Sequence, residues 1–178
     1  MRIILLLTLL LSFNWAAAQK YKSSKGMIKF YSEEVLEDIT AINKKVASIF
    51  DSESGQIVFS VPVNAFEFEK SLMQEHFNEK YMESEKFPKS TFKGTLTGYT
   101  IGQKNPEVWA EGELMIHGIK KNIRIPGSID FLKNGVKIKT VFEVKLIDYG
   151  IEVPSLMFQK IAEEIEVTVE IEYKPYEK

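Results

Sequence analysis

The chain has 178 residues, with 23 Lys and Arg against 25 Asp and Glu, so its formal net charge is −2. This near-balance gives no electrostatic reason to expect a nucleic-acid-binding protein. The sequence contains no cysteine, which excludes disulfide bonds, cysteine-ligated zinc, thiol catalysis and a lipid anchor attached to cysteine.

Residues 1–18 have the pattern of a cleavable signal peptide. Arg2 supplies a positive start, residues 3–11 are apolar, and residues 16–18 are alanines that fit the small-residue cleavage rule. The apolar run is shorter than the roughly 20 residues that a membrane-spanning helix needs. We expect cleavage before Gln19, with an uncleaved N-terminal anchor as the alternative. The mature domain, residues 19–178, would then be periplasmic or secreted and would not span a membrane.

The first clear strand of the mature chain covers residues 57–63. Ser54 and Gly55 form a turn signal before it, and Ile57, Phe59 and Val61 alternate with other residues along it. Successive side chains of a strand point to opposite faces, so this alternation is typical of a strand with one buried face.

A helix is predicted over residues 71–81, the one segment that departs from the period of two. Ser71 and Gln74 have the spacing of a capping box. Met73, Phe77 and Tyr81 then recur every four residues, as on one face of a helix. Pro88 prevents the helix from running further.

Three longer runs downstream again alternate with a period of two, over residues 108–116, 136–146 and 165–173. In the last run every odd-numbered residue is apolar or Tyr, whereas its even-numbered residues are Glu or Thr. Such strands have one apolar face and one polar face.

Turn signals separate these runs. His117-Gly118 ends one strand, and Asn134-Gly135 predicts a hairpin because both residues tolerate positive φ. Pro126-Gly127 predicts a kink or a bulge. In total the chain contains about eight strands with short connections. Strands that are apolar on one face are satisfied by a closed barrel or a sandwich, so the fold class is all-β, in one domain.

Few residues are placed for catalysis or metal binding. The only histidines are His76 and His117, and on the predicted helix Glu79 lies three residues after His76. A carboxylate and an imidazole at this spacing can bind iron or zinc, but the pair occurs once. No nucleophile elbow or glycine-rich phosphate loop is present.

Two segments resemble the YceI-like family. One is the helical segment 71–84 followed by the pattern F-P-x-x-x-F at 87–92, and the other is the strand and turn 112–121, which fits G-x-L-x-I-x-G-x-x-K. The resemblance extends over about residues 26–173. It implies an exported, eight-stranded antiparallel lipocalin-like β-barrel that binds a polyisoprenoid or an isoprenoid quinone in an apolar cavity, with one short helix packed against the barrel.

Strand alternation and the position of the helix predict which side chains meet the ligand. These are Phe59, Val61, Leu72, Met73, Phe77, Phe92, Leu96, Leu114, Ile116, Phe142 and Val144. We expect His76 and Asn78 to lie near one mouth of the barrel, where they would face a headgroup.

The resulting hypothesis is an exported carrier of a long apolar chain, with no enzymatic activity and no cofactor. Its partners would be the lipid and, as a homodimer, a second copy of the chain. Two alternatives stay open: a small exported metal-binding protein or enzyme that uses His76 and Glu79, and a structural or stress-related module whose barrel is filled by its own side chains.

Overall fold

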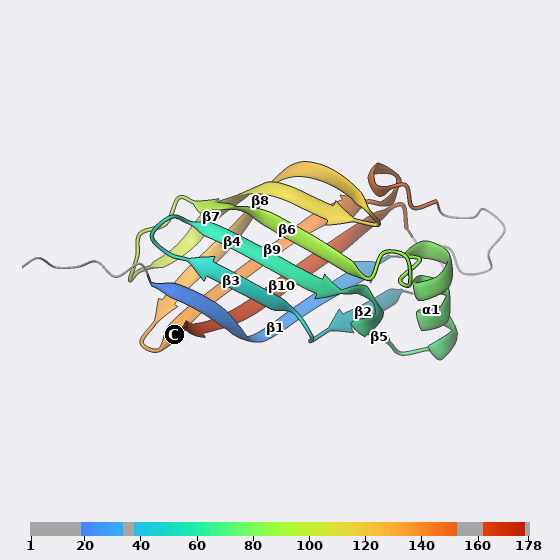
Figure 1. Ribbon diagram of the computed structural model, residues 1–178, viewed down its shortest axis with the longest axis horizontal. Helices are drawn as coiled ribbons and strands as arrows, with labels where there is room; N and C mark the ends of the chain where they lie inside the picture. The colour runs from blue at the N-terminus through green and yellow to red at the C-terminus, as the bar shows by residue number, and fades with distance from the viewer. Residues whose placement is uncertain (1–18, 34–37, 153–161, 177–178) are drawn as a thin grey trace, which may run out of the picture.

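The computed structural model describes residues 19–33, 38–152 and 162–176 (Figure 1). The predicted signal peptide, residues 1–18, lies outside the described residues, so its cleavage stays a prediction.

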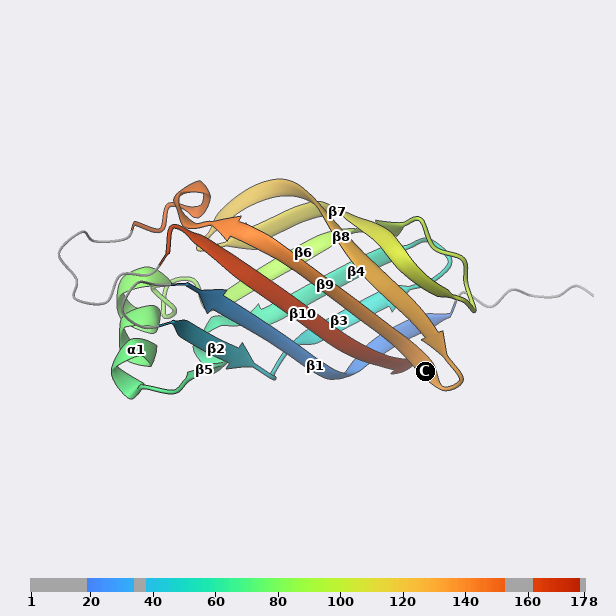
Figure 2. The ribbon, with the colours of Figure 1, turned by 180° about the vertical axis from the view of Figure 1, so that it is seen from behind.

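Eight antiparallel strands close into a barrel, as the alternation and the resemblance predict. Strand β1 pairs with β10 and thereby joins the two ends of the sheet (Figures 1 and 2). The barrel strands are β1 (Lys20–Ser32), β3 (Ala47–Asp51), β4 (Gln56–Pro62), β6 (Lys89–Thr97), β7 (Lys104–Ile116), β8 (Ile119–Leu132), β9 (Gly135–Lys145) and β10 (Glu164–Pro175).

Two short strands extend the sheet beyond the barrel. The first residues of β1, Lys20–Lys22, pair with β3, whereas residues 28–32 of the same strand pair with β2 (Ile39–Asn43). Strand β5 (Phe66–Phe68) then pairs with β2 and follows the short helix η1 (Val63–Ala65). One long strand therefore serves both the barrel and a side sheet that lies next to the helix (Figure 1).

The predicted helix is present but is not uniform. Helix α1 (Ser71–His76) continues into the π-helical turn η2 (Phe77–Tyr81), so the two together cover the predicted range. The capping-box interpretation is wrong, because Lys70 is the N-cap and no side chain caps the helix. The Gln74 Oε1 instead accepts a hydrogen bond from the backbone N–H of Phe68, at 3.3 Å, and ties the helix to β5.

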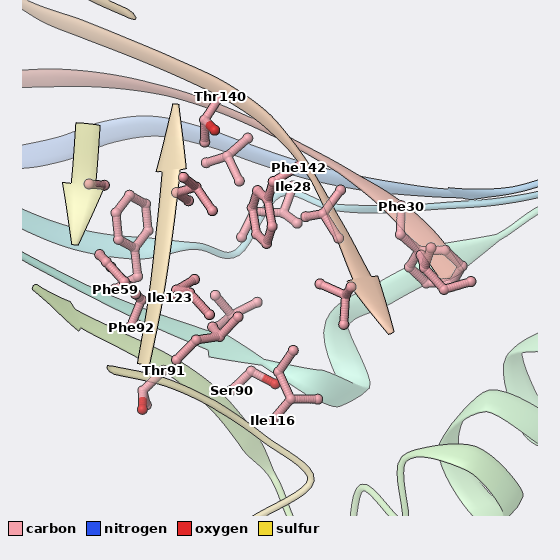
Figure 3. A pocket seen from close by; sticks show the side chains of 18 of the residues that line it. Ile28, Phe30, Phe59, Ser90, Thr91, Phe92, Ile116, Ile123, Thr140 and Phe142 are labelled. Carbon is pink, nitrogen blue, oxygen red and sulfur yellow. The ribbon is translucent and has the colours of Figure 1, made fainter. Parts of the chain in front are cut away.

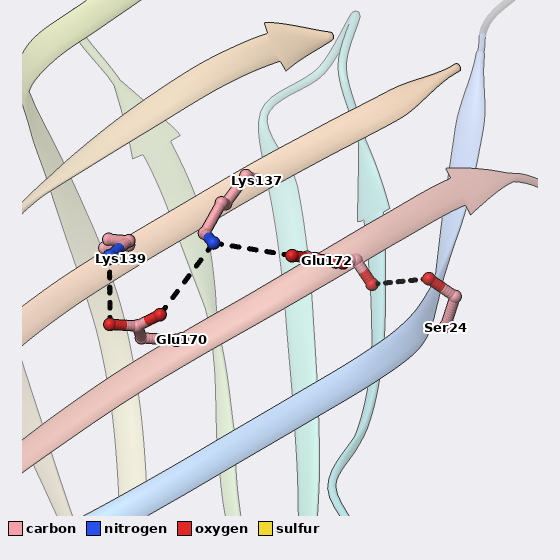
Figure 4. Close-up of polar contacts among 5 residues, drawn as sticks. All are labelled: Ser24, Lys137, Lys139, Glu170 and Glu172. Carbon is pink, nitrogen blue, oxygen red and sulfur yellow. Dashed lines mark hydrogen bonds and ion pairs between the residues drawn. The ribbon is translucent and has the colours of Figure 1, made fainter.

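Oppositely charged side chains cover the outer face of β9 and β10. Lys139 Nζ lies 2.9 Å from the carboxylate of Glu170, and Lys137 Nζ lies 3.4 Å from that of Glu172 (Figure 4). Ser24 is the extra residue of a bulge in β1, and its hydroxyl donates to the carbonyl oxygen of Glu172 at 3.1 Å. The four charged side chains occupy the positions that the period of two predicts to face outward.

Aromatic side chains fill the end of the barrel at which β10 finishes. Phe50 is fully buried, and its ring centroid lies 5.9 Å from that of Tyr99 and 6.1 Å from that of Tyr173. The Tyr173 hydroxyl is 2.7 Å from the hydroxyl of Ser48, which is also buried. A buried hydroxyl needs such a partner. This end of the barrel is therefore closely packed, and its two buried hydroxyl groups are hydrogen-bonded to each other.

The hairpin between β8 and β9 is formed differently from the prediction. Its turn consists of Lys133 and Asn134, and Gly135 is the first residue of β9. Neither Asn134 nor Gly135 has positive φ. A Cβ atom at Gly135 would overlap the carbonyl oxygen of Tyr173, so the glycine is required by the close approach of β10.

The bulge predicted at Pro126-Gly127 is also absent from the ladder between β7 and β8. That ladder runs without a shift from the pair Val108↔Gly127 to the pair Ile116↔Ile119. The irregularity in this ladder lies on β7, between Asn105 and Val108. On the other side of β8, the ladder with β9 stops at the pair Ser128↔Lys139, just before Pro126.

Candidate functional site

The middle of the barrel holds an apolar cavity of about 200 Å³ (Figure 3). Its wall comes from β1, β4, β5, β6, β7, β8, β9 and β10, together with η2 and the short helix η3 (Leu146–Tyr149). Ligand sites are typically concave and apolar with few polar groups, so this cavity is the candidate site.

The pleat of the strands decides which side chains line it. All the strand residues predicted from alternation do so, as does Phe77 from the helix. These lining residues are Phe59, Val61, Phe92, Leu96, Leu114, Ile116, Phe142 and Val144. Whether they contact a ligand stays a prediction.

Many inward-facing residues are only half-buried, although they lie inside the barrel. Phe59, Leu114 and Phe142 belong to this group, whereas Ile129 and Ile171, nearer the packed end, are fully buried. These half-buried side chains pack against the core on one side and border the cavity on the other. The barrel is therefore packed at one end and hollow in the middle, and the interpretation of a barrel filled by its own side chains does not fit.

The opposite end is covered by a cluster of phenylalanines beside the helix. The ring centroid of Phe77 lies 5.5 Å from those of Phe30 and Phe66 and 5.0 Å from that of Phe68. Tyr81, in the same π-helical turn, is also buried. The helix thus contributes one face to the cavity, through the residues that point toward β1 and β5.

The predicted residues Leu72, Met73 and His76 do not line this cavity, which corrects the prediction. Leu72 is 54% exposed, and Met73 lines a separate pocket beside β2 and β5. The helix lies across the end of the barrel, so only its innermost turn, starting at Phe77, reaches the interior. Apolar residues that recur every four positions show that one face of a helix is buried, but they do not show which element covers that face.

Asn78, predicted near a headgroup, also lies outside the cavity. Its Nδ2 donates to the carbonyl oxygen of Gln74 at 2.8 Å. Its Oδ1 is buried and has no hydrogen-bond partner within the described residues.

Several lining residues are absent from the predicted set. Ile28 and Phe30 come from β1, whose sequence lacks clean alternation; Phe30 fits an apolar strand face, but the predicted set does not include it. Ile138, Val167 and Val169 sit on strands whose apolar face the alternation does identify. Carrying the alternation along the full length of those strands would have found them.

The cavity wall offers little to a charged group. Among its described lining residues, Lys139 is the only charged one, and its ammonium group is outside the barrel against Glu170. The neutral polar side chains are Ser90, Thr91, Thr140 and Tyr81. Burying an unpaired charge is costly, so this interior suits an uncharged molecule.

A metal site is not formed at the predicted histidine. His76 ends α1 and Glu79 is exposed in η2. Within residues 19–33, 38–152 and 162–176, no group of three or more His, Cys, Asp or Glu side chains is arranged to hold a metal ion. In the same ranges, the helices are too short or too polar to cross a bilayer.

Solved structures share this fold at low sequence identity. A polyisoprenoid-binding domain from Saccharophagus degradans, implicated in plant cell wall breakdown, has a TM-score of 0.76 at 14% identity, covering 89% of this chain and 99% of its own. BcnA from Burkholderia cenocepacia has a TM-score of 0.70 at 14% identity, with coverages of 82% and 94%. The YceI protein of Campylobacter jejuni has a TM-score of 0.64 at 14% identity, with coverages of 82% and 90%.

A comparison with curated proteins finds no match. The model of the YceI-like domain, in contrast, matches residues 17–173, nearly the whole barrel together with both segments that carry the resemblance. The closed eight-stranded barrel agrees with that match. This chain therefore belongs to the YceI-like domain family.

Proposed function

We propose that the protein binds one uncharged, chain-like lipid, of the polyisoprenoid or isoprenoid-quinone class, in the barrel cavity. The observation that carries this proposal is the hollow interior, which is apolar along its length and enclosed by packed aromatic residues at one end. The YceI-like family and the structural likeness to a polyisoprenoid-binding domain support the same class of ligand.

The energy of the empty cavity favours a ligand. At ~24 cal/mol per Å³, an unfilled volume of 200 Å³ lowers the stability by about 5 kcal/mol. Each CH₂ group that leaves water for such a site returns about 0.8 kcal/mol. Burial of about six such groups offsets the cavity, and longer chains give net binding.

The chemistry of the wall favours a neutral molecule over a fatty acid. Among the described lining residues, a carboxylate inside the cavity would meet no cationic group, because the Lys139 ammonium is held outside by Glu170. A hydroxyl group such as that of Ser90 can serve an alcohol or a quinone carbonyl. An anionic head would have to stay in water at the surface.

The role that follows is to remove a water-insoluble chain from solvent and to deliver it elsewhere, without catalysis. Export by the segment 1–18 would place this carrier in the periplasm or outside the cell. A homodimer is compatible with this role, but the binding proposal does not depend on one.

The test uses all-trans-retinol, a neutral isoprenoid alcohol that fluoresces in apolar surroundings. We expect saturable binding at one site per chain, competition by geranylgeraniol, and weaker competition by palmitate. Organic extraction of the freshly purified protein, followed by mass spectrometry, should release a neutral chain lipid. Absence of both retinol binding and an extractable lipid would refute the proposal.

A further inference from the structure

Strands β8 and β9 are paired over only part of their length. Their ladder runs from the pair Leu132↔Gly135 to the pair Ser128↔Lys139 and then stops. On their other edges, β8 stays paired with β7 as far as Ile119, and β9 stays paired with β10 as far as Lys145. Residues 119–127 and 140–145 thus present two facing edges without a shared ladder, and β8 bows away from β9 there (Figures 1 and 2). We call this gap the β8–β9 slit.

Pro126 explains why the ladder ends where it does. The existing register, if continued, would place Pro126 opposite Val141. The hydroxyl of Thr140 on β9 donates to the carbonyl oxygen of Pro126 at 2.5 Å, so this carbonyl points toward β9. The nitrogen of a strand residue points the same way as its carbonyl, and that of proline has no hydrogen to donate. The next pair of ladder hydrogen bonds is therefore replaced by one side-chain bond.

Helix η3 (Leu146–Tyr149) closes the far end of the slit. The carbonyl oxygen of Tyr149 lies 3.2 Å from Nδ1 of His117, in the turn before β8. Asp148 lies 3.6 Å from Nζ of Lys121. The slit is thus bounded by the β8–β9 ladder at one end and by these contacts at the other, and it does not continue as a split along the whole barrel.

The slit leads into the cavity. Ile123 and Ile125 on one side and Phe142 and Val144 on the other line both the slit and the cavity, with Ile123 and Phe142 shown in Figure 3. The cavity is also lined by Pro126 and Lys139, which occupy outward-facing, exposed positions of their strands. At the slit, where no ladder joins the two strands, the cavity therefore extends between the facing edges as far as these two residues.

The two ends of the barrel offer no comparable path within the described residues. The Phe50 and Tyr173 rings pack one end. At the other, Phe77, Tyr81 and Met82 are each less than a tenth exposed.

We propose that the β8–β9 slit is a lateral portal, through which a neutral isoprenoid chain enters and leaves the cavity sideways. The inference rests on the proposed function. Its physical basis is that the slit can widen without breaking ladder hydrogen bonds, whereas either packed end opens only if buried aromatic rings move. The facing edges are polar backbone that water satisfies when the portal is empty.

The test joins the two edges covalently. Asn122 and Glu143 are exposed on the outer side of the slit, and the chain has no native cysteine. N122C/E143C linked by a short bis-maleimide should bind and release retinol at least about tenfold more slowly, at unchanged affinity, because both rates fall together. The matched control is K137C/E172C, a cross-strand pair on the complete β9–β10 ladder outside the slit, whose linkage should leave both rates unchanged.

A second design restores the ladder without a linker. P126V/T140V supplies the missing N–H and removes the hydroxyl that replaces it, and it should slow retinol exchange relative to T140V alone. Unchanged rates in both the linked and the ladder-restored proteins would overturn the portal while leaving the proposed function intact. An unmodified chain that takes up no retinol would overturn both.

Discussion

His117 and Glu83 are joined by a hydrogen bond of 2.8 Å between Nε2 and a carboxylate oxygen, across 34 residues of sequence. They are also the two non-glycine residues with positive φ among the residues that the structure describes, at 50° and 41°. Such a conformation is costly unless the surroundings hold it. Here Nδ1 of the same imidazole faces the carbonyl oxygen of Tyr149, so one side chain ties two strained turns and η3 together.

His117→Ala should destabilise the fold, because it leaves Glu83 and the Tyr149 carbonyl without this partner. His117 has only 12% side-chain exposure, and we expect a loss of about 1–3 kcal/mol in the free energy of unfolding, measured by urea titration. His76→Ala is the matched control and should cost less than about 0.5 kcal/mol. Equal losses in the two variants would contradict this role of His117.

Ala110→Phe should fill the cavity and weaken ligand binding without unfolding the protein. Ala110 lines the cavity from β7, so a larger ring there occupies the volume that the ligand would take. We expect retinol affinity to fall at least about tenfold, since each 1.4 kcal/mol of lost burial is one factor of ten. Lys93→Phe, on the exposed outer face of β6, should leave the affinity unchanged. Tight retinol binding by Ala110→Phe would place the ligand elsewhere.

Because the Tyr173 phenol is buried, we expect the free energy of unfolding to fall at alkaline pH. Burial raises the pKa of its phenol well above the ordinary value of 10.0. Because the folded-state pKa is the higher one, the contribution to stability is full below the unfolded value and declines as the pH rises above it. Urea midpoints at about pH 8 and about pH 11 should therefore differ more in the wild type than in Tyr173→Phe.

Tyr173→Phe should also lower the free energy of unfolding at neutral pH. Tyr173→Phe leaves the buried Ser48 hydroxyl without its partner, which should lower the stability by about 1–2 kcal/mol. In S48A/Y173F both polar groups are absent, and much of that loss should return. No recovery in the double variant would mean that ring packing, and not the hydrogen bond, accounts for the loss.

Gly112→Ala should destabilise the β6–β7 ladder. Gly112 pairs directly with Gly94, and a Cβ atom at Gly112 would overlap both Cα of Gly94 and the carbonyl oxygen of Lys93. Backbone cannot move aside as a flexible side chain does, so we expect a loss of more than about 2 kcal/mol. Gly102→Asn is the control, since nothing lies within 4 Å of a Cβ there and Asn tolerates positive φ. A thermal midpoint unchanged by Gly112→Ala would show that the two strands can separate.

Much of the site follows from local sequence. The period of two placed Phe59, Leu114 and Phe142 on the inner face because the pleat leaves no other choice once the register holds. The inward face of the helix could not be predicted in the same way. Phe77 faces the interior and Leu72 does not, and a stripe of apolar residues in the sequence does not say which element will cover it. Ile28 and Phe30 were missed because β1 changes partners along its length, and its two halves face different surroundings.

By itself, the sequence determined the β class, the inward set of each regular strand and the resemblance to the YceI-like family, since all of these depend on the order of neighbouring residues. Only the tertiary structure decided that the barrel is packed around Phe50 yet hollow near Phe142, and that β8 separates from β9 beyond Pro126. The reason is that filling and separation depend on side chains and strand edges that meet across the barrel from distant parts of the chain, and no local pattern records those distances.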